Sequence, residues 1–186
     1  MRNLFLALLL LAAPAAFGQS PKETSQRVRA IQQQVRAIGH DSLRRVDFSQ
    51  AMLPPDTVRR LHINLFQPRY VACYAPDGQL QELLVGQMDA HYSSSSTKYY
   101  FVQGEVVYVD TDYVNGSRMG SCGQVHFHNR YYVVKGQLLD ARLSGPPKDG
   151  PFYYCYGPVI PGQELARLLQ EVQPALAKVP PYRVEK

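Results

Sequence analysis

The residues best suited to chemistry are a cysteine and two histidines that lie close together in the chain. Cys122 comes shortly before His126 and His128. Residues two positions apart in a strand point to the same face, so the two imidazoles would lie side by side. Together with Cys122, Asp110 or Asp112 they could complete a metal site, because zinc is bound by thiolate, imidazole and carboxylate groups. A thiol beside an imidazole could instead act as a nucleophile with its base.

The same histidines also fit a strand that does no chemistry. Val125 and Phe127 alternate with them, which is typical of a strand with one polar and one buried face. A metal site needs three or four converging ligands, and the sequence points only two of them together. There is no nucleotide-binding loop, dinucleotide fingerprint, nucleophile elbow or zinc-helix motif. We therefore expect no cofactor and no metal. A small exported hydrolase or metal-binding protein using Cys122, His126 and His128 remains the alternative function.

The tyrosines are the most unusual feature of the composition. Twelve of the 13 lie between Tyr70 and Tyr156. Neighbouring residues in a strand face opposite sides, so one ring of each tyrosine doublet can enter the core while the other stands outside. Such an outer row suits contact with a protein, peptide or glycan, and we predict that it contains Tyr100, Tyr108 and Tyr132. The competing interpretation is that tyrosine is a strong strand former and fills cross-strand positions.

The first eighteen residues have the pattern of an export signal. Arg2 gives a positive start, an apolar run extends from Leu4 to Phe17, and small residues stand at Ala16 and Gly18. The mature chain is then expected to begin near Gln19, as a periplasmic or secreted protein. The alternative, a membrane anchor, needs about 20 apolar residues, which is more than this run provides.

Three cysteines matter more if the compartment is oxidising. We expect Cys122 to pair with Cys155, leaving Cys73 as a small buried residue of a strand. Closing a loop of that length stabilises a fold by about 3 to 4 kcal/mol. The alternative is that no bridge forms, since three thiols give no even-numbered framework.

The charge of the chain is mildly basic. The formal net charge is +5, and removal of Arg2 leaves +4, with seven arginines in the N-terminal third. This basic segment could favour an anionic surface, although the solvated side of an amphipathic helix explains it as well. Nucleic acid is not an expected partner for an exported chain of such low charge.

Helices are predicted at both ends of the mature chain. From Pro21 to about Phe48, apolar residues recur at helical spacing, with a bend expected at residues 39–41. Pro54 and Pro55 stop any helix, and a linker runs to about Arg60. A second amphipathic helix is predicted from about Pro161 to Ala177.

Between Leu61 and Tyr156 the pattern changes to short apolar runs punctuated by glycine, which is typical of hairpins. Three copies of Tyr, three residues, Gly, one polar residue, then Leu or Val begin at Tyr74, Tyr100 and Tyr132. Each contains a turn dipeptide ending in Gly78, Gly104 or Gly136. Two-residue turns would place cross-strand pairs as follows: Phe101 with Val106, Tyr99 with Tyr108, Val133 with Leu138, and Tyr131 with Asp140. Polar loops are expected at residues 87–98 and 112–124, and a further strand at 152–156.

The hairpin motif resembles the repeat hairpins of YwqK-type antitoxin and MORN-like proteins over about seven residues in each copy. The links between copies are longer and less regular than in those families. The resemblance therefore implies a shared hairpin turn and carries no function or site residues to this chain.

These patterns predict one α+β domain in the mature chain. Residues 1–18 are the signal peptide, 19–60 the N-terminal helix and linker, and 61–186 an antiparallel sheet with the C-terminal helix. The sheet is expected to contain six to eight strands in consecutive hairpins, with both helices on one face. The leading hypothesis for function is a non-catalytic binding module of the cell envelope or medium.

Overall fold

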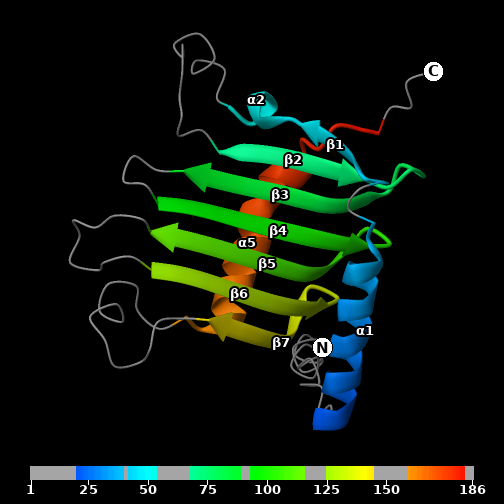
Figure 1. Cartoon of the computed structure of the whole chain (residues 1–186), viewed down its shortest axis with the longest axis vertical. Helices are drawn as coiled ribbons and strands as arrows, with labels where there is room; N and C mark the ends of the chain where they lie inside the picture. Colours follow the sequence, from blue (N-terminus) through cyan, green and yellow to red (C-terminus); the bar gives the residue numbers. More distant parts are fainter. Residues whose placement is uncertain are drawn as a thin grey trace, which may run out of the picture.

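A computed structural model describes residues 20–39, 42–53, 68–88, 93–115, 125–144 and 159–182. The fold is α+β, with one antiparallel sheet whose seven strands follow one another in sequence order (Figure 1). The strands are β1 (Arg44–Asp47), β2 (Arg69–Tyr74), β3 (Leu80–Met88), β4 (Ser93–Val102), β5 (Glu105–Asn115), β6 (Val125–Val134) and β7 (Gln137–Ser144). The helices are α1 (Pro21–Ala37), the short α2 (Ser49–Met52) and α5 (Pro161–Leu176). This confirms the predicted sheet of consecutive hairpins.

Helix α1 begins where the sequence provides strong start signals. The Ser20 side chain accepts a hydrogen bond from the Glu23 amide, and the Glu23 carboxylate accepts one from the Ser20 amide. This reciprocal capping satisfies donors that the first turn cannot bond internally. The predicted extension to about Phe48 is wrong, because the helix ends at Ala37 and residues 44–47 form β1, with Val46 paired to Ala72.

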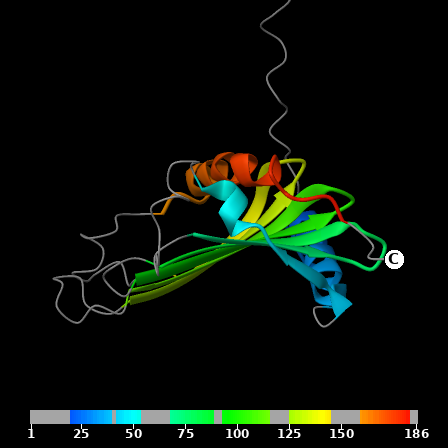
Figure 2. The same cartoon turned by 90° about the horizontal axis from the view of Figure 1, so that it is seen from above.

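The two long helices lie on opposite faces of the sheet (Figure 2), not on one face as we expected. The reason lies in the two doublets that the structure describes, Tyr99–Tyr100 and Tyr131–Tyr132, since each supplies one ring to each face. Tyr99 faces α5, and its hydroxyl donates to the Leu168 carbonyl at 3.1 Å. Its neighbour Tyr100 faces α1. The α5 side is the larger core and contains Leu83, Tyr99, Phe101, Val109, Tyr131, Val133, Leu165, Leu168 and Val172.

Two hairpins turn at the predicted dipeptides. Gln103 and Gly104 have φ values of 52° and 81°, and Lys135 and Gly136 have 50° and 73°. Positive φ at both positions matches the twist of tight hairpins. The predicted pairs Phe101 with Val106 and Val133 with Leu138 are confirmed.

Beyond these pairs the register shifts. A bulge follows Tyr100 in the β4–β5 pair and another follows Tyr132 in the β6–β7 pair. As a result Tyr108 pairs with Tyr100 rather than Tyr99, and Asp140 pairs with Tyr132 rather than Tyr131. One extra residue on one strand causes each shift.

The strands are also longer than the sequence indicated. Ser93–Ser96 belong to β4, and residues 112–115 belong to β5. Serine and aspartate are poor strand formers, but here Ser94–Ser96 and Asp112 are each paired with a strand on both sides. The strand predicted at residues 152–156 and the linker at 54–60 lie outside the described residues.

Candidate functional site

The three tyrosines predicted to form an outer row lie beneath α1. Tyr100, Tyr108 and Tyr132 are 6%, 9% and 1% exposed. Their rings follow one another across three strands, with centroids 5.5 Å apart for the first pair and 5.2 Å for the second. The Tyr132 hydroxyl accepts a hydrogen bond from Gln32 Nε2 at 2.7 Å. These rings therefore attach α1 to the sheet, and the exposed residues of this face lie elsewhere.

Burial also governs the acidity of these phenols. Loss of solvent raises the pKa of Tyr100 and of Tyr108 well above its usual value. The Asp110 carboxylate acts in the same direction on both phenols, and the Glu82 carboxylate on Tyr100. Both rings thus stay neutral and act as packing groups at any physiological pH.

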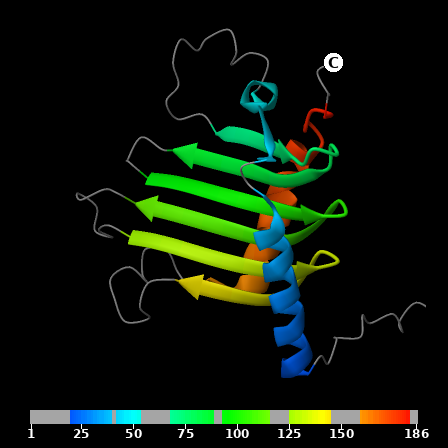
Figure 3. The ribbon, with the colours of Figure 1, turned by 45° about the vertical axis from the view of Figure 1, so that its right-hand side comes forward.

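Beside the tyrosines, the same sheet face continues as two polar cross-strand rows. Helix α1 crosses the strands near the hairpin turns (Figure 3), and these rows lie toward the other end of the strands. We call these rows the polar patch. Its first row crosses β4 to β7 as Lys98, Asp110, Arg130 and Arg142, and its second as Ser96, Asp112, His128 and Ser144. His126 follows the second row along β6. The side chain of His126 is 62% exposed and that of Asp112 46%.

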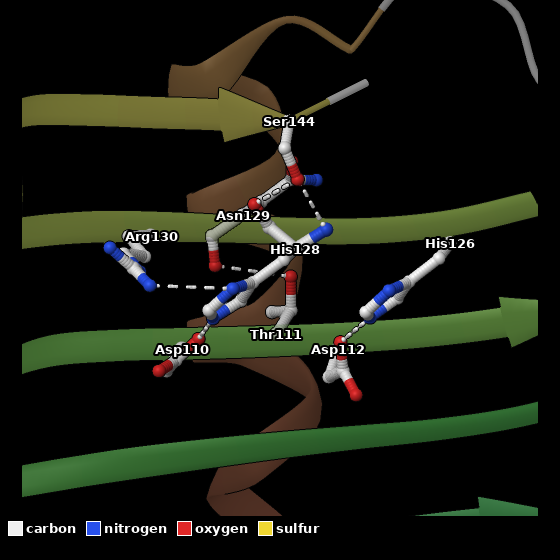
Figure 4. A network of polar contacts seen from close by, with 8 residues as sticks. All are labelled: Asp110, Thr111, Asp112, His126, His128, Asn129, Arg130 and Ser144. Atoms are coloured by element: carbon white, nitrogen blue, oxygen red, sulfur yellow. Dashed lines mark hydrogen bonds and ion pairs between the residues drawn. The ribbon is translucent and has the colours of Figure 1, made fainter. Parts of the chain in front are cut away.

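Each histidine of the patch bonds an aspartate on the neighbouring strand (Figure 4). His126 Nε2 lies 2.5 Å from Asp112 Oδ1, and His128 Nε2 lies 2.5 Å from Asp110 Oδ1. Both contacts are diagonal, because the residues directly opposite are Val114 and Asp112. The strand alternation expected from the sequence thus places both imidazoles on one face and brings both predicted aspartates to them.

This arrangement restricts the chemistry available to His128. A carboxylate accepts hydrogen bonds only, so Nε2 carries the proton that it shares with Asp110. The other ring nitrogen, Nδ1, faces Arg130 Nη2 at 3.4 Å. A guanidinium in that position donates to the nitrogen and repels a cation, which leaves no lone pair for a metal ion.

A serine also lies next to His128, but it is not placed as a nucleophile. Ser144 Oγ accepts from the His128 amide at 2.8 Å and donates to the His128 carbonyl at 2.7 Å. Both contacts are to the backbone, so the imidazole does not activate this hydroxyl. Among the described ranges, no group of three or more histidine, cysteine or acidic side chains could hold a metal ion.

The cysteine hypotheses are only partly within the described residues. Cys73 is in β2, 2% exposed, with a free thiol whose pKa is raised by burial and by the Glu82 charge. Such a thiol is unreactive. Cys122 and Cys155 lie outside the described residues, so their predicted bridge and the Cys122 nucleophile remain predictions.

Sequence reasoning missed the basic part of the patch. Lys98, Arg130 and Arg142 are far apart in the chain, and only the bulged registers align them in one row. The available signal was alternation, because Arg130 and His128 are two residues apart and must share a face.

Comparison with known proteins gave no match to a family model, a curated protein or a solved structure. In the part of the chain that is described, no helix is long and apolar enough to cross a membrane.

Proposed function

We propose that this chain is an exported, non-catalytic module of the periplasm or medium that binds an acidic glycan through the polar patch. One observation carries the proposal: α1 covers only part of its sheet face, and the rest presents three cations in one row. The sole acid of that row, Asp110, already bonds His128. Carboxylate groups of a glycan would find Lys98, Arg130 and Arg142 on a single surface.

The character of the patch favours a glycan over a protein or peptide partner. Protein interfaces are centred on aromatic anchors in dry pockets. Here the tyrosines of this face are covered by α1, while the two rows offer charged groups and the hydroxyls of Ser96 and Ser144. Charged and hydroxyl groups match a ligand that carries many hydroxyls and repeated carboxylates.

Helix α1 adds basic residues along one border of the patch. Arg27 and Gln34 line a cavity of about 250 Å³ with Lys135 at the hairpin turns. With 3.6 residues per turn, Gln32, which bonds Tyr132, lies on the opposite flank of the helix from Arg27 and Gln34. Arg29 and Arg36 are three and four residues from Gln32, so helical spacing places them on that flank, and both are exposed.

Binding to alginate, a polysaccharide of uronic acids, tests this proposal. The double variant Lys98→Ala, Arg130→Ala should elute from an alginate column at clearly lower salt than the unmodified protein, because ion pairs to the glycan are screened by salt. The matched control is Arg27→Ala, Lys135→Ala, which removes the same charge from the other flank of α1. Equal shifts for both variants would show that only net charge matters, and would contradict a site at the patch.

The alternative function is a small exported hydrolase or metal-binding protein that uses Cys122, His126 and His128. One observation favours it: the exposed His126 already has a carboxylate partner, as an oriented base or metal ligand does. Metal analysis of the purified protein distinguishes the two functions. Stoichiometric zinc or copper that is lost in the double variant His126→Ala, His128→Ala would support the alternative. The binding module predicts the same metal content, close to none, in both proteins.

A further inference from the structure

Strand β7 is the edge of the sheet that lies nearest to the N-terminal half of α1 (Figure 1). Edge strands usually carry lysine, proline or other features that prevent pairing with another chain. Residues 137–144 read Gln-Leu-Leu-Asp-Ala-Arg-Leu-Ser, with neither proline nor lysine. Leu143, next to the strand's end, is 40% exposed. Within the described ranges, no other strand pairs with the outer side of β7.

Among the described residues, nothing pairs with the backbone groups on the outer side of β7 in its second half. The His128 amide points toward Ser144, with which it is paired. Amides of an antiparallel strand alternate in direction, so those of Arg142 and Ser144 point to β6. The amides of Ala141 and Leu143 then point outward and are available to a strand placed alongside.

One charge on β7 is unfavourably placed in a single copy. Arg142 lies directly opposite Arg130, and like charges in that position are destabilising. Arg142 also stacks over the Tyr132 ring, with its guanidinium carbon 5.8 Å from the centroid. Asp140 lies two residues before Arg142, on the same face and opposite Tyr132.

A second copy of β7 places an opposite charge across from Arg142 in one register. If Ala141 lies opposite the partner's Ala141, Asp140 lies opposite the partner's Arg142, and the reverse pair forms by symmetry. A twofold axis perpendicular to the sheet keeps each face on its own side, so both pairs form on the face of the polar patch. Shifting the register by two residues places Arg142 opposite the partner's Arg142, or Asp140 opposite the partner's Asp140. Charge thus selects the first register.

The position of α1 fits the same assembly. Figures 1 and 3 show its N-terminal turns continuing past β7, beyond the edge of the sheet. Pro21, Lys22 and Glu23 are exposed there. In the twofold arrangement this overhang extends across the junction, on the α1 face of the second copy.

We propose that the chain forms a twofold dimer in which β7 pairs antiparallel with β7 of a second copy, centred on Ala141. The two sheets then form one continuous sheet. Asp140 and Arg142 make reciprocal pairs across the junction, and the outward amides of Ala141 and Leu143 gain acceptors.

Light scattering after size exclusion, over a range of concentrations of the mature chain, tests the dimer. Asp140→Arg and Arg142→Asp each place like charges opposite one another and should raise the dimer dissociation constant about tenfold or more. The exchange variant Asp140→Arg, Arg142→Asp restores opposite charges and should recover the dimer. Ala141→Pro removes an outward amide and should also give monomers, since proline is tolerated at an edge position that faces solvent.

Circular dichroism and thermal melting of each variant establish that the sheet remains folded. A monomeric unmodified chain would overturn the proposal. So would single variants that stay dimeric, or an exchange variant that is folded and monomeric. If the unmodified chain forms the dimer but does not bind alginate, the glycan function is contradicted and the dimer is not.

Discussion

Replacing Tyr132 with alanine is expected to lower the free energy of unfolding by about 3 to 5 kcal/mol, as for other large aromatic side chains removed from a core. Tyr132 is 1% exposed and packs against the Tyr108 ring in a tilted arrangement. It also holds Gln32 of α1 and supports the Arg142 guanidinium. Its loss therefore leaves a cavity between helix and sheet. The measurement is chemical denaturation followed by circular dichroism.

The smaller variants separate packing from hydrogen bonding. Tyr132→Phe keeps the ring and removes only the hydroxyl, so it should cost about 1 kcal/mol, as should Gln32→Ala. Limited proteolysis at Arg27 and Arg29 should become faster in Tyr132→Ala than in either of these variants, because α1 loses both a packing partner and the hydrogen bond of Gln32. Equal stability of the alanine and phenylalanine variants would contradict the placement of α1 over this ring.

Replacing Gly104 with valine should destabilise the fold by about 2 kcal/mol, because a β-branched residue resists the left-handed region. Gly104 has φ of 81°, and a Cβ added there would meet nothing within 4 Å. The cost is therefore conformational rather than steric, and it would appear as a lower melting temperature.

Comparison with two other substitutions checks that reasoning. Gly104→Asn should cost less than valine, since asparagine tolerates positive φ. Gly78→Val should cost more, because φ is 87° and a Cβ there would lie 2.9 Å from the Tyr182 ring. Unchanged melting of Gly104→Val would contradict the tight hairpin between β4 and β5.

The hairpins could be predicted because their signal is local. In the second and third copies of the motif, three residues separate the tyrosine from a glycine, and that glycine marks the turn. Both residues of each turn dipeptide have positive φ. The extent of the strands could not be predicted, since Ser93–Ser96 are held in β4 by the neighbouring strands rather than by their own preference.

The candidate site was predictable only in part, for a related reason. Alternation along one strand placed His126 and His128 together, and proximity in sequence suggested the two aspartates that they bond. The row from Lys98 to Arg142 depends on the register of three strand pairs, two of which contain a bulge. Bulges leave no clear mark in a single sequence, so the row could not be foreseen.

The sequential strand order also determines how such a chain can fold. Every strand pair joins neighbours in sequence, and short links join the strands from β2 to β7, so most of the sheet has low contact order. Docking of α1 is different, because the Gln32 to Tyr132 contact spans 100 residues. Helix α1 precedes the sheet in the chain and completes its contacts only after β6 has been synthesised. Until then its apolar stripe is exposed, and a chaperone that shields this helix would act at the most vulnerable stage of folding.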